Sequence, residues 1–295
     1  MVATDSPNTT RVRSGNVDVD VTNESWGDGD GVDDVTTGSG ADQVFGGAGD
    51  DTLDVGAGDN FVAGDYLDAQ INVDGSRTIT NDHESTSGSD RAGANTSVGG
   101  DAWTTDGQGS DTVDGGNGNN VVMADTGNYT LEADGDILVT VTNESWGAGD
   151  GDDTVSVGSG NDQVFGGAGS DTVGGLDTNG DGTVDVTNDG NNFIAGDYIN
   201  LVDRRATDGS VTIVDDHTTG TGFDGADDIS SGLGNDWIFA GQGSDNVDGG
   251  NGDNVVMADT GNYTLDGSGN VDVQIGRASG RERGEIAVVA LSVKK

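Results

Sequence analysis

The chain has 295 residues, of which 54 are acidic and 11 basic, so that its formal net charge is −43. This charge excludes nucleic acids and anionic membrane surfaces as partners, because proteins bind phosphate groups through clustered lysine and arginine. No apolar run approaches the roughly 20 residues that a membrane-spanning helix needs, and the absence of cysteine excludes disulfides. With only 31% hydrophobic residues, the composition alone is typical of a disordered chain, so a fold has to be argued from the residue pattern.

The pattern begins after residues 1–16, which are predicted to form an N-terminal tail. The alternating segment VDVDV at 17–21 indicates a short strand. From residue 28 to residue 63 the sequence then repeats every nine residues, as DGDGVDDVT, TGSGADQVF, GGAGDDTLD and VGAGDNFVA. Glycine stands at positions two and four of each unit, aspartate or asparagine at position six, and valine or leucine at position eight.

The same nonapeptide returns in three later runs, at 106–123, 148–174 and 222–257. Glycine at positions two and four permits positive φ angles and tight turns. A single branched apolar residue at position eight makes a three-residue strand that buries one side chain. Because such a strand is unstable alone, its copies must stack and bury a common apolar column. The predicted fold class is therefore all-β, a parallel β-roll or β-solenoid.

A larger duplication is superimposed on the nonapeptides. The segment GNNVVMADTGNYTL at 118–131 recurs with one change at 252–265. We therefore predict two tandem β-roll modules, at 17–136 and 137–270, followed by the start of a third copy at 271–274.

The last segment, 275–295, does not follow the pattern of the modules. It carries five of the eleven basic residues and resembles the translation of a sequencing adapter. We expect it to be non-native, and the alternative is a genuine basic tail.

The units GGAGDDTLD and GGAGSDTVG resemble, at every defined position, the hemolysin-type calcium-binding nonapeptide of the repeat-in-toxin (RTX) family. The resemblance implies that two nonapeptides make one turn of the roll, so that loops on one edge lie eighteen residues apart. It then places Asp33 opposite Asp51, and Asp227 opposite Asp245. It also implies export of an unfolded chain that folds outside the cell.

Stacked carboxylates repel each other, and a hard cation with six to eight oxygen ligands converts that repulsion into stabilisation. With two histidines and no cysteine, the chain does not suit zinc or copper, and carbonyl-lined flexible loops favour Ca²⁺ over Mg²⁺. We predict several Ca²⁺ ions. The candidate ligands at position six are Asp33, Asp42, Asp51, Asn60, Asp111, Asn120, Asp153, Asp162, Asp171, Asn192, Asp227, Asp236, Asp245 and Asn254.

Each run, the third being counted with the unit that follows the insertion at 177–188, ends with asparagine at position six, and an aspartate follows five residues later. The pairs are Asn60 with Asp65, Asn120 with Asp125, Asn192 with Asp197, and Asn254 with Asp259. The hypothesis is that a terminal loop faces only one neighbour and carries less charge, and that the later aspartate completes its metal site. The alternative is inheritance through the duplication.

The insertion DTNGDGTVDVTN at 177–188 resembles a dockerin-type, EF-hand-like calcium loop. Its candidate ligands are Asp177, Asn179, Asp181 and Asp185. The twelfth position holds an asparagine in place of the usual acidic residue, and the alternative is a turn rich in aspartate and glycine.

No catalytic site is expected. The chain has no cysteine nucleophile and no G-x-S-x-G motif, and His83 lacks the second histidine of a metalloprotease helix. The predicted function is calcium binding by a secreted or cell-surface module, a structural or adhesive segment of a larger extracellular protein. The alternatives are the C-terminal repeat region of a secreted enzyme or toxin, and a segment that binds polysaccharide or ice. Position three is irregular in the first run, which counts against an ice-binding array.

Overall fold

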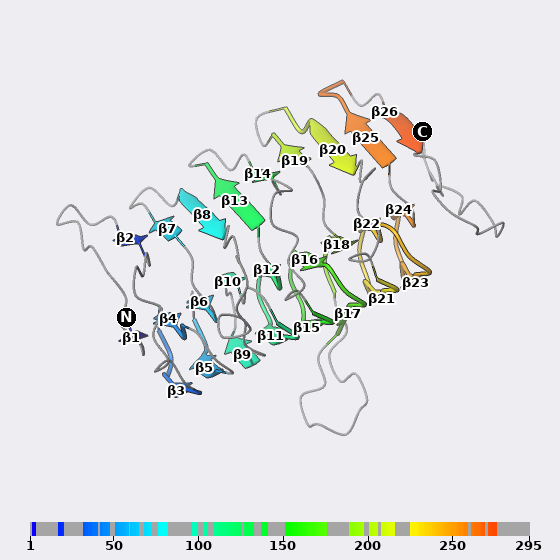
Figure 1. Ribbon diagram of the computed structural model, residues 1–295. Coiled ribbons are helices and arrows are strands. Elements are labelled where there is room, and N and C mark those ends of the chain that lie inside the picture. The colour runs from blue at the N-terminus through cyan, green and yellow to red at the C-terminus, as the bar shows by residue number, and fades with distance from the viewer. Residues whose placement is uncertain are drawn as a thin grey trace, which may run out of the picture.

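The computed structural model shows a long molecule built from strands (Figure 1). The part of the chain that it describes comprises residues 2–3, 17–20, 32–40, 42–47, 51–58, 60–64, 68–71, 76–81, 96–99, 103–105, 109–125, 127–132, 137–140, 151–175, 189–197, 201–205, 208–215, 225–258, 261–268 and 271–275. These residues form 26 strands and no helix.

The first parallel sheet has nine strands, and its interior strands are three to five residues long. In order across the sheet, they are β1 (Val2–Ala3), β4 (Gln43–Phe45), β6 (Phe61–Ala63), β10 (Trp103–Thr105), β12 (Val121–Met123), β16 (Gln163–Gly167), β18 (Phe193–Asp197), β22 (Trp237–Phe239) and β24 (Val255–Met257).

The second parallel sheet has eight strands and faces the first. They are β3 (Asp34–Thr36), β5 (Thr52–Gly56), β9 (Thr96–Gly99), β11 (Thr112–Gly116), β15 (Thr154–Val157), β17 (Thr172–Gly174), β21 (Asp228–Ser230) and β23 (Asn246–Asp248). Partners within a run lie 18 residues apart, as in Asp34 with Thr52 and Gln43 with Phe61. The predicted parallel β-roll with two nonapeptides per turn is confirmed.

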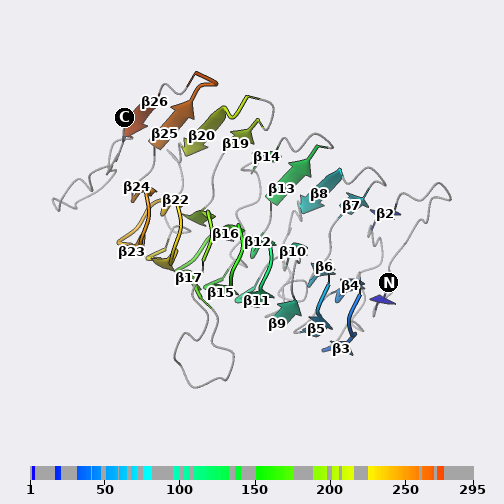
Figure 2. The ribbon, with the colours of Figure 1, turned by 180° about the vertical axis from the view of Figure 1, so that it is seen from behind.

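An antiparallel sheet of nine strands runs along the outside of the first parallel sheet (Figures 1 and 2). Its strands are β2 (Val17–Asp20), β7 (Asp68–Ile71), β8 (Arg77–Asn81), β13 (Gly127–Leu131), β14 (Ile137–Thr140), β19 (Leu201–Arg204), β20 (Val211–Asp215), β25 (Gly261–Leu265) and β26 (Val271–Ile275). The nonapeptide analysis did not predict this sheet, because its strands lie in the segments between the runs.

The chain path repeats four times along the molecule. In each unit the chain crosses the second and first parallel sheets alternately, twice each, and then leaves the roll for two strands of the antiparallel sheet. The units are β3–β8, β9–β14, β15–β20 and β21–β26. We call each departure of the chain from the roll to the antiparallel sheet an excursion. The turns before and after an excursion still pair directly in the parallel sheets, so that Thr112 pairs with Thr154 and Val121 with Gln163 across 42 residues. The excursions therefore interrupt the sequence but not the sheets.

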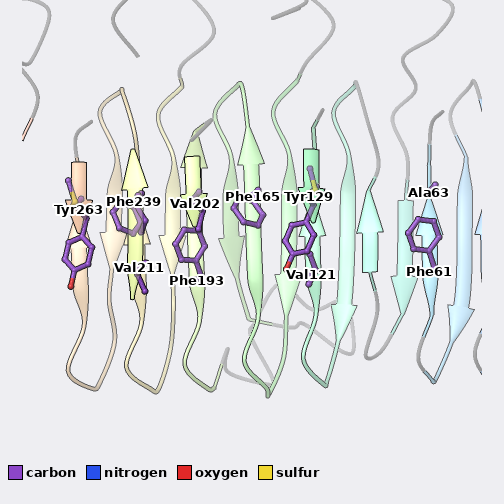
Figure 3. Close-up of a cluster of buried hydrophobic side chains, with 14 of the residues drawn as sticks. Phe61, Ala63, Val121, Tyr129, Phe165, Phe193, Val202, Val211, Phe239 and Tyr263 are labelled. Atoms are coloured by element: carbon purple, nitrogen blue, oxygen red, sulfur yellow. The ribbon is translucent and has the colours of Figure 1, made fainter. Parts of the chain in front are cut away.

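Two apolar cores result from the three sheets. The core between the parallel sheets is the column of position-eight residues, such as Val113, Val155 and Ile229, each 1% exposed. The second core lies between the first parallel sheet and the antiparallel sheet, where a row of aromatic rings follows the axis of the roll (Figure 3). Within that row the ring centroids of Phe165 and Phe193 are 5.5 Å apart.

The second core has a signal in the sequence that the nonapeptide consensus hides. Strands of the first parallel sheet, such as Phe61–Ala63 and Val121–Met123, are apolar at positions seven, eight and nine, and all three residues are buried. Strands of the second sheet such as Asp34–Thr36 and Asp228–Ser230 bury only the residue at position eight. A strand that is apolar throughout is buried on both faces, and this pattern in alternate nonapeptides indicates a third layer.

Position-four glycines allow the turns to stack closely. The φ angles of Gly160, Gly190 and Gly234 lie between +141° and +146°, a backbone region that residues with a Cβ atom rarely adopt. Adjacent loops also hydrogen bond, with the Gly190 N–H donating to the Leu233 carbonyl at 2.7 Å. A Cβ on Gly234 would overlap the carbonyl oxygen of Gly190 in the neighbouring turn.

Replacing Gly234 with alanine is therefore expected to destabilise the calcium-loaded protein by about 3 kcal/mol, because it adds both backbone strain and a backbone collision. Gly174→Ala is the control, since a Cβ there meets nothing within 4 Å and its φ angle is not positive. Urea unfolding at saturating Ca²⁺ measures both, and the control is expected to change by less than about 0.5 kcal/mol. Equal effects of the two substitutions would contradict the close stacking.

Candidate metal centre

The position-six residues form two columns, one along each edge of the roll. The residues that precede strands of the second parallel sheet are all aspartates where the structure describes them, and we call this column the aspartate edge. It consists of Asp33, Asp51, Asp111, Asp153, Asp171, Asp227 and Asp245. The sequence prediction that Asp33 lies beside Asp51, and Asp227 beside Asp245, agrees with this arrangement.

Neighbouring members of the aspartate edge are linked by a regular hydrogen bond. The backbone N–H of one aspartate donates to Oδ1 of the aspartate in the next turn. Examples are Asp153 to Asp171 at 2.9 Å and Asp171 to Asp227 at 2.8 Å. This bond holds each carboxylate inside the stack, and Asp171 and Asp227 are each 1% exposed.

The opposite edge, which precedes strands of the first parallel sheet, mixes aspartate with asparagine. Its described members are Asp42, Asn60, Asn120, Asp162, Asn192, Asp236 and Asn254. We call it the mixed edge. The same backbone bond recurs here, with the Asn192 N–H donating to Asp236 Oδ1 at 2.9 Å.

The mixed edge corrects the hypothesis that asparagine marks a loop with only one neighbour. Asn192 lies in the middle of its column: its Oδ1 accepts a hydrogen bond from the Asp162 N–H, and its own N–H donates to Asp236. Asn120 likewise donates to Asp162. The runs end in sequence but the stack continues across the excursion, so a run boundary is not an end of the column.

Asparagine and aspartate side chains make different hydrogen bonds in the loops. Asn192 Nδ2 donates to the carbonyl oxygen of Ser231 at 3.3 Å, and Asn60 Nδ2 donates to that of Gly56 at 3.2 Å. An ionised aspartate has no proton to donate. The second carboxylate oxygens of Asp33 and Asp171 are buried and accept no hydrogen bond from the described residues. On the aspartate edge, a cation is therefore the partner that suits the available oxygens.

Glycine at position one brings further oxygens to the aspartate edge. A Cβ on Gly166 would collide both with Oδ2 of Asp171 and with the carbonyl oxygen of Gly196 in the next turn. Gly46 has the same relation to Asp51 and Gly64. A carboxylate oxygen and a carbonyl oxygen thus converge where a side chain is absent, and this hard-oxygen donor set fits Ca²⁺.

Four segments of the chain, 28–62, 96–131, 147–180 and 221–256, match the family described as RTX calcium-binding nonapeptide repeat. These segments are RTX repeats. RTX nonapeptide repeats bind several Ca²⁺ ions. That the stacked aspartates supply the oxygens in this chain stays a prediction. No curated protein and no solved structure matches the chain.

Within the described residues, no three acidic or histidine side chains converge on one point. An ion on the aspartate edge of these RTX repeats would therefore take carboxylates from two neighbouring turns and the remaining oxygens from loop carbonyls or water. For the ion between the fifth and sixth described members, the carboxylates would be those of Asp171 and Asp227, joined by the Gly196 carbonyl. When bound, the ion neutralises charge that the buried stack otherwise holds without compensation.

Burial alters the titration of the RTX carboxylates. It raises the pKa of Asp171 from 3.8 to about 7, opposed by the Asp153 N–H and increased by the nearby charge of Asp152. Burial also raises the pKa of Asp236. Without metal, folding therefore favours protonation of these groups.

The metal-free chain is consequently expected to hold more β-structure at pH 5 than at pH 8. Because the pKa of Asp171 is higher in the folded than in the unfolded state, its proton stabilises the fold below about pH 4, and this stabilisation is lost as the pH rises through about 7. Circular dichroism in EDTA at the two pH values measures the difference. Saturating Ca²⁺ is expected to remove it, and a metal-free β signal that increases with pH would contradict the assignment.

The aspartates that follow the runs have a different place from the position-six residues. Asp125 and Asp197 occupy nonapeptide position two, where the chain leaves the roll, and each is 2% exposed. Asp197 accepts N–H bonds from Gly225 at 3.4 Å and from Gln242 at 2.5 Å. Gly225 belongs to the returning chain and Gln242 to the next turn. The Asp197 carboxylate thus links the two ends of the loop that the excursion interrupts to the uninterrupted loop of the next turn.

Asp125 makes the corresponding contact, accepting the Ala168 N–H at 2.7 Å. Whether these two aspartates also bind Ca²⁺ stays a prediction. The remaining candidate ligands lie outside the described residues: Asp65, Asp177, Asn179, Asp181, Asp185 and Asp259.

Proposed function

We propose that the chain is a calcium-dependent structural or adhesive segment of a secreted or cell-surface protein, folding when it meets extracellular Ca²⁺. The observation that supports this most strongly is the aspartate edge, where seven stacked position-six residues all carry a carboxylate. RTX repeats typically occur in secreted proteins. None of the described residues forms a helix long and apolar enough to cross a membrane.

The energetic argument connects the metal to the compartment. Binding free energy of an ion that binds only the folded state is folding free energy. Each ion added to the stack offsets the repulsion of two buried carboxylates, so folding and binding occur together. In low-calcium cytosol the net charge of −43 keeps the chain open, and at extracellular concentrations the roll forms.

A calcium titration of the full chain tests the proposal. The folding midpoint, followed by far-ultraviolet circular dichroism, is expected above roughly 1 μM and below roughly 1 mM, the range of weak sensors and extracellular modules. The transition is expected to be cooperative because each turn needs its neighbours. A chain already folded at submicromolar Ca²⁺ would exclude calcium as the trigger at the cell boundary.

We also propose that the chain has no catalytic activity of its own. The acidic residues recur with the architectural period of the roll, so no carboxylate pair is distinguished from its neighbours as an acid and base would be. A structural or adhesive role within a larger protein is consistent with a long rod of repeated units.

A further inference from the structure

The two edges of the roll carry different chemistry at the same position of the repeat. On the aspartate edge, each of the five described pairs of hydrogen-bonded neighbours brings two carboxylates together. The described mixed edge also has five such pairs, and one member of every pair is an asparagine. The edges therefore share a backbone bond but differ in the charge that they place between turns.

Asp171 and Asn192 show what this difference does to the neighbouring carbonyl. On the aspartate edge, a Cβ on Gly166 would meet both Oδ2 of Asp171 and the carbonyl oxygen of Gly196, which stands at position one of the next turn. On the mixed edge, position one of the next turn is Ser231, and Asn192 Nδ2 donates to its carbonyl oxygen at 3.3 Å. The amide N–H of Asn192 thus replaces the second oxygen of an aspartate and binds the equivalent carbonyl directly.

Asn120 makes a corresponding bond to a carboxylate. Its Nδ2 donates to Oδ1 of Asp162 in the next turn at 3.0 Å, and to the carbonyl oxygen of Gly118 in its own loop at 3.3 Å. The same Oδ1 of Asp162 accepts the backbone N–H of Asn120 at 2.9 Å. Because Asp162 is buried, these two N–H groups supply polar contacts to a carboxylate that is shielded from water.

Position one gives the mixed edge branched apolar side chains, whereas the described aspartate edge has only glycine and alanine there. On the mixed edge this position includes Val55 and Val157, which are fully buried in the apolar core. A Cβ on Gly115 would approach Cγ1 of Val157 and the side-chain carbons of Asn120. The place where two oxygens converge beside Gly166 is thus taken, beside Gly115, by a methyl group and an amide.

These contacts remove the reason for a cation on the mixed edge. A carboxylate beside an amide meets no like charge, and the amide donates N–H groups to oxygens that an ion would otherwise bind. An ion there would have to displace bonds such as those from Asn120 to Asp162 and from Asn192 to Ser231. On the aspartate edge, an ionised position-six side chain has no proton with which to make such a bond.

We propose that asparagine amides take the place of bound ions along the mixed edge, so that Ca²⁺ binds the aspartate edge and the mixed edge closes without metal. This assignment covers the turns that the structure describes, and it rests on the calcium binding of the repeats in the proposed function. The position-six ligands are then the carboxylates of the aspartate edge. Calcium concentration controls one edge of each turn, and hydrogen bonds alone close the other.

Counting the ions bound by the full chain, with isothermal titration calorimetry, tests the assignment. Asn192→Asp removes an amide donor and puts three carboxylates in a row with Asp162 and Asp236, so it is expected to add at least one Ca²⁺ ion. Asn191→Asp is the matched control, since Asn191 is exposed and its Oδ1 accepts the Asn235 N–H at 2.9 Å. The control adds the same charge one residue away and is expected to leave the number of ions unchanged.

Removing a carboxylate from either edge gives a second, independent comparison. Asp162→Asn keeps the Oδ1 acceptor for Asn120, and it is expected to bind as many ions as the unaltered chain. Asp171→Asn removes a carboxylate from between two others and is expected to lose at least one ion. Because these two variants remove charge, they decide the question even where Asn192→Asp fails to fold. Circular dichroism at saturating Ca²⁺ measures the folding of every variant.

The outcomes separate this assignment from the proposed function. An unaltered chain that bound no Ca²⁺ would refute both. A chain that binds Ca²⁺ would refute the assignment alone if folded Asn192→Asp gained no ion, if Asn191→Asp gained as many, or if Asp162→Asn lost an ion as Asp171→Asn does.

Discussion

Removing Ca²⁺ with EDTA at pH 7.5 is expected to convert the full chain from a β-sheet spectrum to that of a largely unfolded coil. The aspartate edge stacks carboxylates in neighbouring turns, and those of Asp153, Asp171 and Asp227 are buried. Without a cation, desolvation and mutual repulsion oppose the stack, and the small apolar column offers little compensation. The effect is expected to reverse when Ca²⁺ is restored.

The same experiment can count ions and discriminate metals. The described aspartate edge contains five neighbouring pairs linked by N–H to Oδ1 bonds, so calorimetry is expected to find at least five Ca²⁺ ions. Mg²⁺ serves as the control, and we expect it to restore the β signal poorly because it demands octahedral geometry and retains its water. A chelated chain that keeps its full β spectrum would show that the stack is stable without metal.

Replacing Asp171 with asparagine is expected to raise the Ca²⁺ concentration at the folding midpoint about tenfold or more. Asp171 lies between Asp153 and Asp227, so its carboxylate would be shared by the two neighbouring candidate sites. Asparagine keeps the Oδ1 acceptor but loses the charge, as at the mixed edge, where asparagine Nδ2 donates to loop carbonyls. The metal-free chain is expected to become more stable, because a buried charge is removed.

Asp152→Asn is the matched control for this substitution. Asp152 is exposed, adjoins the aspartate edge, and uses Oδ1 to accept the Ser170 N–H at 2.9 Å. The control removes the same charge and retains the same acceptor, so its midpoint is expected to change by less than about twofold. Calcium titrations followed by circular dichroism compare the two variants. Equal shifts would show that net charge, rather than the position of the carboxylate, controls calcium affinity.

The nonapeptide period by itself determined the class of fold and the chemistry of its edges. Glycine at position four, aspartate at position six and valine at position eight each meet a local requirement: a positive φ angle, a charge in a loop, and one buried side chain in a short strand. These requirements repeat with the chain, so local sequence was sufficient to predict stacked parallel strands and neighbours such as Asp33 and Asp51.

The tertiary structure alone decided which turns become neighbours across the excursions. Asn192 ends a run in the sequence, yet it lies between Asp162 and Asp236, because sheet pairing continues while the intervening chain crosses to the antiparallel sheet. The roles of Asp125 and Asp197 in joining interrupted loops depend on contacts between residues 28–45 positions apart. The hairpins of the antiparallel sheet pair with one another across still longer separations, as in Gly127 with Asn81 and Ile137 with Arg204. A nine-residue period carries no information about such separations, which depend on how the sheets pair and on the packing of the aromatic row beneath the antiparallel sheet.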